Sequence, residues 1–268
     1  MPGPYIGFYV AAHEDDWQFF RGEQAYADLN AANVRIVFIH TTAGDAGRTD
    51  GWWEVRERGA IASIRAAVPA APLKFDVRTV NGHPISVYVC GNSTSYFLRL
   101  PDGYGQQNLP TLNSLTHLRD GVVSSIAAVD HSTSYAGWSD FWNTLKGILQ
   151  TETAASSSVN PWVNAPDYNT VRNPNDHADH KATADALRMF VSSSYNRAWW
   201  VGYDIQNRPV NLSGTPYNQK KSLVDAYSNM VLQLTTQNGA PSQADPAEWA
   251  AFGPHSYVTI RSYGMVDD

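Results

Sequence analysis

An almost wholly apolar segment, YIGFYVAA, runs from Tyr5 to Ala12 and stops at a histidine followed by three acids. A strand with so little polar alternation is typical of a parallel sheet that is covered on both faces. Helix-like and strand-like segments then alternate along the chain, at residues 15–31, 34–44, 52–67 and 73–80. We therefore predict an α/β fold of the Rossmann-like kind, a doubly wound and mostly parallel sheet flanked by helices with right-handed crossovers.

The second half of the chain is less regular. Asn81-Gly82 predicts a hairpin turn, and residues 98–115 form a long polar loop with Gly and Pro. Further helices are expected at 137–153, 181–194 and 217–237, and strands at 161–169 and 198–205. No Pro/Ser-rich or charge-block linker divides the sequence, so we expect one domain over residues 1–268, with a partly irregular insertion and C-terminal helices.

Charge and cysteine content exclude several classes of protein. The net charge is -6 and the pI about 5.7, without a run of Lys or Arg, which disfavours nucleic acid and anionic membrane surfaces as partners. The lone cysteine, Cys90, cannot form an intramolecular disulfide or a Cys-rich zinc module. The sequence shows neither a secretory leader nor about 18 uninterrupted apolar residues, so a cytoplasmic protein is the expectation. The oligomeric state stays open.

The residues that end the first strand are the first candidate site. In an open α/β sheet, ligands bind beyond the carboxyl ends of the strands, where His13, Glu14, Asp15 and Asp16 are expected to lie. The alternative is an ordinary strand-to-helix turn in which Asp15 or Asp16 caps the helix.

A second cluster, NPNDHADH, precedes a predicted helix. His177 and His180 are three residues apart, so they share a helix face if the helix begins near Asp176, with Asp179 between them. The alternative is a charged helix start on the surface. A zinc hydrolase typically uses three N/O protein ligands and one water, which becomes the nucleophile. His13, Asp16 and one of the two helix histidines would provide such a set.

The two clusters resemble the motifs of the PIG-L/LmbE-like family of zinc-dependent de-N-acetylases, the N-acetylglucosaminyl deacetylases. That family has AHPDD after its first strand and HPDH at a later helix start, and this chain has AHEDD and HADH. Glu14 and Ala178 replace the two prolines, and Trp17 stands where an acid often follows. Three weaker matches occur in the family's order, namely TTAGDAG (41–47), VRERGA (55–60) and RLPDG (99–103).

The resemblance implies a role for each matching position. His13, Asp16 and His180 would bind one Zn²⁺ per chain, and Asp15 would be the general base that activates the zinc-bound water. The residues left over would act on the substrate. His177 would stabilise the oxyanion or protonate the departing amine with Asp179 orienting its ring, while hydroxyl groups would be held by Asp45, Arg56 and Asp102. For these last three, a turn or a solvated helix face is the alternative.

We therefore expect a hydrolase that removes an N-acetyl group from an N-acetylglucosamine-type sugar or glycoconjugate. The first alternative is an amidase acting on another N-acyl or sugar-conjugate amide. The second is a carbohydrate-binding protein of the same fold without catalysis. A nucleotide binder is disfavoured because no Gly-x-Gly-x-x-Gly follows the first strand. The native metal stays open, since Fe²⁺ occupies similar N/O ligand sets.

Overall fold

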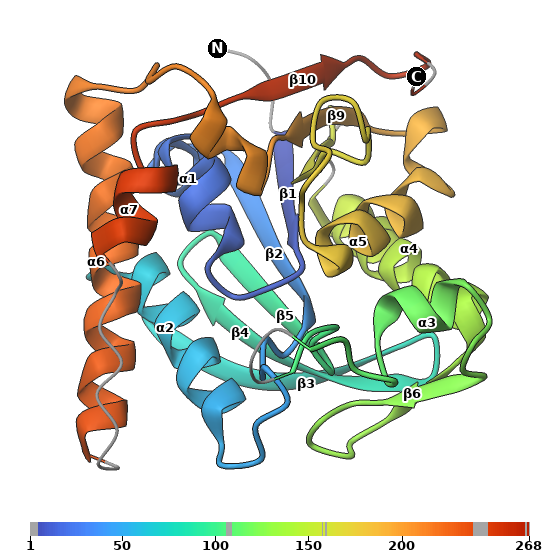
Figure 1. Cartoon of the computed structure of the whole chain (residues 1–268). Helices are drawn as coiled ribbons and strands as arrows, with labels where there is room; N and C mark the ends of the chain where they lie inside the picture. The colour runs from blue at the N-terminus through green and yellow to red at the C-terminus, as the bar shows by residue number, and fades with distance from the viewer. Residues whose placement is uncertain are drawn as a thin grey trace.

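The structure is a computed structural model that describes residues 5–105, 109–156, 158, 160–237, 246–265 and 267. Within these residues the main sheet has eight strands: β1 (Tyr5–Ala11), β2 (Val34–Thr42), β3 (Leu73–Val80), β4 (His83–Cys90), β5 (Ser93–Leu100), β8 (Trp162–Pro166), β9 (Asn196–Trp200) and β10 (Val258–Arg261). Their order across the sheet is β10-β9-β8-β1-β2-β5-β4-β3 (Figure 1). A separate ribbon pairs β6 (Ser125–Ala127) with β7 (Ser134–Ala136).

The five central strands are parallel and the edges are antiparallel. β9, β8, β1, β2 and β5 pair in parallel, whereas β10 joins one edge and the β3–β4 hairpin joins the other in antiparallel pairs. The chain builds outward from β1 first toward β2 and β5, and later toward β8 and β9 on the opposite side. The gap beyond the carboxyl ends of β1 and β8 is therefore the topological switch point, where open α/β sheets bind ligands.

Helices cover both faces of the sheet, as expected for a doubly wound fold (Figure 1). One face carries α1 (Asp16–Leu29), α2 (Trp52–Ala67), α6 (Gly214–Gln237) and α7 (Pro246–Phe252). The other carries α3 (Leu115–Arg119), α4 (Gly137–Ser156) and α5 (Ala178–Arg188). Each layer buries its own apolar cluster against the sheet. The predicted α/β fold with a mostly parallel, helix-flanked sheet is confirmed.

Local sequence explains the elements that flank the site. Six of the seven β1 residues are buried, in keeping with a strand that is apolar on both faces. The β3–β4 turn has positive φ at both Asn81 (50°) and Gly82 (85°), which is the backbone that an Asn-Gly hairpin turn requires.

The structure differs from the sequence prediction in several places. α3, β6 and β7 lie where no element was predicted, and the predicted strand at 198–205 ends at Trp200, with a 3₁₀ turn over Tyr203–Asn207. β5 lies in a region without a predicted strand, and β10 and α7 follow the last predicted helix. α5 begins at Ala178, three residues before the predicted start, because the His177 side chain caps the helix by accepting a hydrogen bond from the Asp179 backbone N–H. The helix ends at Arg188, and a short 3₁₀ turn (Val191–Ser193) follows.

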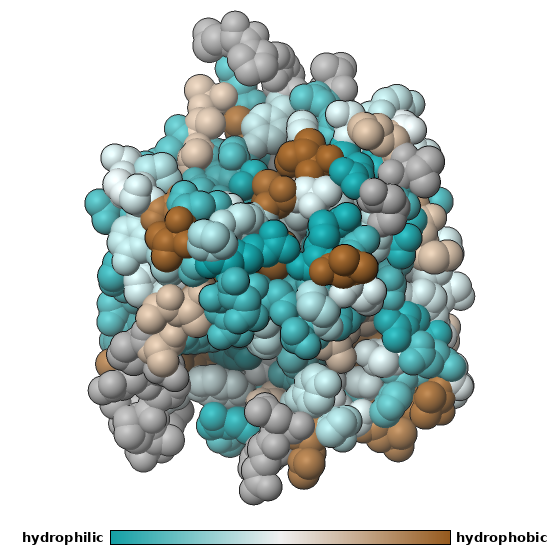
Figure 2. All heavy atoms as spheres, turned by 45° about the horizontal axis from the view of Figure 1, so that its top comes forward, coloured by the Kyte–Doolittle hydropathy of each residue, from teal (hydrophilic) through white to brown (hydrophobic). Residues whose placement is uncertain are grey.

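The surface drawn in Figure 2 is mixed in character. Hydrophilic residues occupy much of this face, and the hydrophobic residues form several separated patches. Scattered apolar side chains of this kind are usual on a protein surface. Among the described residues, none of the helices combines the length and apolar character that crossing a membrane requires.

Candidate metal and catalytic site

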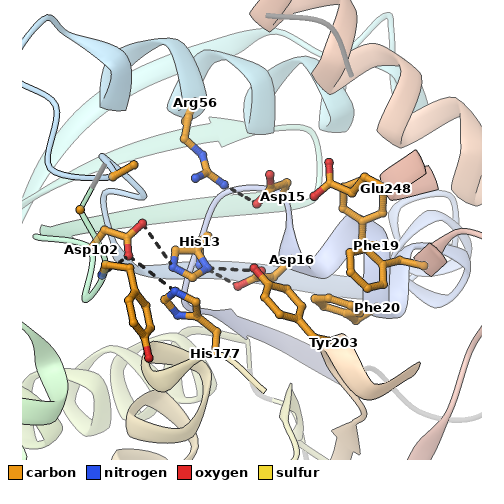
Figure 3. A pocket seen from close by; sticks show the side chains of 14 residues that line it. His13, Asp15, Asp16, Phe19, Phe20, Arg56, Asp102, His177, Tyr203 and Glu248 are labelled. Atoms are coloured by element: carbon orange, nitrogen blue, oxygen red, sulfur yellow. Dashed lines mark hydrogen bonds and ion pairs between the residues drawn. The ribbon is translucent and has the colours of Figure 1, made fainter. Parts of the chain in front are cut away.

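Two distant segments meet at the switch point between β1 and β8. The residues directly after β1 carry the AHEDD sequence, and the HADH sequence spans the N-cap and the first turn of α5, after the loop from β8. Figure 3 shows the side chains of His13, Asp15, Asp16 and His177 turned toward one pocket. The fold therefore brings together the residues that the two sequence clusters singled out.

Three buried side chains point their ligand atoms at a common centre. His180 Nε2 lies 3.0 Å from Asp16 Oδ1 and 3.3 Å from His13 Nδ1, and His13 Nδ1 lies 3.5 Å from Asp16 Oδ1. His13, Asp16 and His180 are at most 4% exposed. A tetrahedral zinc ion with ligands at about 2.1 Å separates those ligands by about 3.4 Å, so the three atoms fit such an ion.

The chemistry of the three atoms also favours a cation. His180 Nδ1 lies 2.8 Å from Asp176 Oδ1, an acceptor, so Nδ1 carries a proton. His180 Nε2 faces the Asp16 carboxylate at 3.0 Å, so either a proton or a metal ion has to lie between these two atoms. Although burial alone would lower the pKa of His180, Asp16 and Asp176 raise it to about 10. The pair of carboxylates thus draws positive charge to this point.

Asp176 holds the His180 ring from behind. Its Oδ1 also accepts from the Tyr203 backbone N–H at 3.0 Å, and its Oδ2 accepts from Asn173 Nδ2 at 2.5 Å. A Cβ on Gly202 would lie 2.2 Å from Asp176 Oδ1, so only glycine allows this close approach. A carboxylate behind a metal-binding imidazole fixes the ring and its tautomer. No motif in the sequence marks this role, although Asp176 stands four residues before His180.

Asp15 presents its carboxylate to the pocket. It occupies the N-cap position of α1, but its side chain makes no capping hydrogen bond. Asp16 does not cap the helix either, because its Oδ2 accepts from the His13 backbone N–H at 2.7 Å. One oxygen of Asp15 instead forms an ion pair with Arg56 Nη2 (Figure 3). The two adjacent aspartates therefore point in different directions. Asp16 turns toward the candidate metal triangle, which we define as His13 Nδ1, Asp16 Oδ1 and His180 Nε2, and Asp15 turns toward the pocket.

His177 lies at the opposite side of the same centre. Its Nδ1 accepts from the Asp179 backbone N–H at 3.2 Å, which leaves Nε2 as the ring nitrogen that carries the proton. Burial and the neighbouring His13 and His180 lower the pKa of His177 to about 3, so the ring is neutral. A neutral imidazole with Nε2–H is a hydrogen-bond donor.

The Asp179 carboxylate lies among the Gly103 backbone, His13 and His177. Its Oδ2 accepts from the Gly103 backbone N–H at 2.7 Å and lies 3.5 Å from His13 Nε2, compared with 3.7 Å from His177 Nδ1. The backbone of Asp179, and not its carboxylate, orients the His177 ring. A Cβ on Gly103 would lie 2.7 Å from Asp179 Oδ1, so this loop is built closely around the carboxylate.

The three predicted substrate contacts divide into two groups. Asp45 uses Oδ1 to accept from the Asp102 backbone N–H at 2.7 Å and Oδ2 to accept from the Gly47 N–H at 3.0 Å. Both carboxylate oxygens of Asp45 therefore bind backbone N–H groups, and Asp45 holds the two loops together. Asp102 and Arg56 line the pocket, and Asp102 lies 3.8 Å from both His13 Nε2 and His177 Nε2. Although burial would raise the pKa of Asp102, His13 lowers it below its ordinary value.

The pocket beside these groups has a volume of about 340 Å³ and two kinds of wall. Asp15, Arg56 and Asp102 form a charged side (Figure 3). The other side is an aromatic wall, which we define as Phe19, Phe20, Tyr203 and Phe252. Tyr203 stacks on Phe252 with ring centroids 5.4 Å apart and lies edge-on to His180 at 5.2 Å. Sequence analysis did not identify this wall, because its members come from three separate segments.

Comparison with known proteins shows that the fold of this chain is similar to that of several solved structures. A scan against protein-family models finds no match, and a search of the curated proteins finds none either. Among solved structures, N,N′-diacetylchitobiose deacetylase from Pyrococcus horikoshii matches with a TM-score of 0.50 and 14% identity, over 97% of this chain and 84% of that chain. A zinc-inhibited form of teicoplanin deacetylase matches with a TM-score of 0.46 and 12% identity, over 88% and 87%. GalB, a 4-carboxy-2-hydroxymuconate hydratase from Pseudomonas putida, matches with 0.41 and 10%, over 98% and 99%. At such identities a likeness concerns the fold, and function has to be argued from the site.

Proposed function

We propose that this protein is a metal-dependent hydrolase that removes the acetyl group from an N-acetylglucosamine-type sugar or glycoconjugate. The observation that carries the proposal is the convergence of His13, Asp16 and His180 on one buried point, next to a pocket that also contains Asp15 and His177. When bound at that point, a divalent cation such as zinc supplies an acidified water and a Lewis acid for an amide carbonyl.

Asp15 and His177, which lie beside this point, carry out the other steps of the proposed reaction. Asp15 accepts a proton from the attacking water, because one of its oxygens is held by Arg56 and the other is available to the pocket. His177 donates its Nε2–H to the carbonyl oxygen as that oxygen gains negative charge. As the C–N bond breaks, the proton on Asp15 passes to the departing nitrogen, giving acetate and a free amine.

A sugar suits both walls of the pocket. Hydroxyl groups can hydrogen-bond to Arg56 and Asp102, and the aromatic wall offers rings that pack against the apolar face of a pyranose. The deacetylase from P. horikoshii, which has a similar fold, acts on N,N′-diacetylchitobiose according to its name. These features support an N-acetylated mono- or disaccharide as the first substrate to test.

The test is a screen of N-acetylated sugars for acetate release, with zinc-loaded protein and with protein treated with a chelator. We expect release that is lost with the chelator, is restored by Zn²⁺, and falls by at least a hundredfold in Asp15→Asn. Tight sugar binding without acetate release in the metal-loaded protein would instead support a binding protein of the same fold.

One observation favours a second candidate, an amidase with a larger acyl group. The aromatic wall reaches the metal triangle itself, since Phe20 lies edge-on to His180 with ring centroids 5.8 Å apart. An apolar acyl chain could pack there as well as a sugar ring. The same screen with N-butanoyl and N-octanoyl glucosamine decides between them, because a deacetylase prefers the acetyl compound and an acyl-chain amidase prefers the longer ones.

A further inference from the structure

Arg56, which binds the proposed general base, is itself held by three residues, and one of them, Tyr227, lies outside every matched motif. Its Nη1 donates to the Gly44 carbonyl at 3.0 Å, and its Nε donates to the Tyr227 hydroxyl at 3.0 Å. The Glu14 carboxyl lies 3.2 Å from the same Nε at ion-pair distance. With Nη1 and Nε engaged, Nη2 is the nitrogen directed to Asp15 Oδ1.

Tyr227 reaches this point from α6, more than 160 residues away in sequence from Arg56. α6 packs along α2, and the Ser63 hydroxyl on α2 donates to the Leu223 carbonyl on α6 at 2.8 Å. The Tyr227 ring lies in a notch at Gly59, where a Cβ would be 2.7 Å from two ring carbons. Tyr227 is only 7% exposed, so its hydroxyl is held in the interior beside Arg56.

These close contacts fix the orientation of the Arg56 guanidinium plane. A Cβ on Gly44 would lie 2.5 Å from Arg56 Nη1 and 2.6 Å from Glu14 Oε2, so the loop after β2 also packs tightly against Arg56. Gly44 has a φ of 50°, the left-handed region that favours glycine. A guanidinium held at three nitrogens has little freedom to leave Asp15, since its planar fork is already organised.

We propose that Tyr227 is a positioning residue, which acts through Arg56 to hold the Asp15 carboxylate in the orientation that proton transfer requires. This inference rests on the proposed function, in which Asp15 is the general base. Tyr227 does not line the pocket, so it acts on the reaction without touching the substrate. Tyr227 thus connects α6 to the site, and the AHEDD and HADH motifs do not reveal this connection.

The test compares Tyr227→Phe with Tyr217→Phe, a matched control. Tyr217 is on the same helix, and its hydroxyl likewise accepts a hydrogen bond from a neighbouring N–H, that of Trp249 at 3.0 Å. We expect Tyr227→Phe to lower kcat about five- to twentyfold, with KM within twofold and zinc content unchanged, while Tyr217→Phe stays within twofold of wild type. Equal effects of the two variants, or a change confined to KM, would overturn the inference.

A double-mutant cycle separates positioning from a merely structural effect. In an Asp15→Asn background, adding Tyr227→Phe is expected to change the residual rate less than twofold, because the carboxylate on which it acts has been removed. Additive losses would contradict action through Asp15. Gly59→Ala provides a second approach, since its Cβ displaces the Tyr227 ring without removing the hydroxyl, and it should reproduce the loss in kcat.

Crystal structures of the wild type and Tyr227→Phe give a readout that needs no substrate. We expect the Arg56 guanidinium to move and its contact with Asp15 to lengthen or break in the variant. An unchanged Arg56–Asp15 contact would overturn the inference even if the protein hydrolyses no amide. If instead Asp15→Asn keeps wild-type turnover while Arg56 moves as expected, the proposed function fails and the contact network stands.

Discussion

Replacing Asp176 by Asn should weaken zinc binding without touching a zinc ligand. The Asp176 carboxylate accepts from His180 Nδ1 at 2.8 Å and from the Tyr203 backbone N–H at 3.0 Å. Asn has the same size and keeps one oxygen, so it can preserve the ring orientation but removes the negative charge. The charge is present at neutral pH, because burial alone would raise the pKa of Asp176 but His180 lowers it below the ordinary value.

The size of the effect follows from the position of Asp176, which contacts a proposed metal ligand, His180, and not the metal itself. Mutating a carboxylate that supports a metal-binding imidazole typically costs 10- to 100-fold in affinity, or about 1.4–2.7 kcal/mol. We expect a loss of affinity in the upper half of that range, because Asp176 is 7% exposed and little water can replace its charge. The stoichiometry should remain one zinc per chain, since His13, Asp16 and His180 are intact.

The assay is a zinc titration of chelator-treated protein against a competing indicator, at a fixed pH near 7. Asp185→Asn is the control, because Asp185 lies on the same helix, α5, and pairs at the surface with Arg119 at 2.8 Å and Arg188 at 3.7 Å. Asp176→Asn should raise Kd at least tenfold and Asp185→Asn less than twofold. A Kd for Asp176→Asn within twofold of wild type would refute the reasoning about the support of His180.

Three further predictions concern the site and the helix that supports it. Asp15→Asn should retain one zinc per chain and lose at least a hundredfold in kcat, measured by acetate release; retention of wild-type turnover would show that Asp15 is not the base. His180→Ala should lose zinc affinity in the titration described above, whereas His177→Ala should keep the metal and lose rate, and reversed outcomes would exchange the two roles. Lys220 is fully buried and donates to the His255 carbonyl at 2.6 Å, and burial lowers its pKa to about 8 from about 10.5. Because the unfolded chain then binds more protons between these pH values, the stability that Lys220 contributes is lower below pH 8 and rises toward pH 10.5, by up to about 3 kcal/mol. Urea unfolding of wild type and Lys220→Met across pH 7–10.5 measures this, and a difference between the two that does not change with pH would count against it.

Hydrophobic periodicity and turn residues predicted the elements whose buried faces follow from the local sequence alone. The β1 region is apolar on both faces, and α2 has the predicted bounds, Trp52–Ala67, because its apolar spacing matches the face that it buries. β5 was not predicted, since it begins with Ser93, Thr94 and Ser95. Those residues are buried because β5 lies between β2 and β4, a pairing that depends on the whole sheet and not on local sequence.

The site could be predicted from sequence where its parts follow strand ends or short motifs. The AHEDD and HADH segments predicted residues that the fold brings together beside one pocket, because chemistry-bearing residues gather at the carboxyl ends of parallel strands. For Asp45 the sequence predicted a substrate contact, and only the folded loops show that its two oxygens accept from backbone N–H groups. Tyr227 had no signal in the sequence, because its contact with Arg56 joins helices that are paired only in the tertiary structure.

The central claim is that His13, Asp16 and His180 together bind one divalent metal ion. Anomalous diffraction at the zinc edge, from crystals of zinc-loaded protein, tests it most directly. The account predicts one strong peak at about 2.0–2.2 Å from His13 Nδ1, an Asp16 carboxylate oxygen and His180 Nε2. A zinc-saturated protein whose anomalous peak lies elsewhere, with these three side chains free of metal, would contradict it.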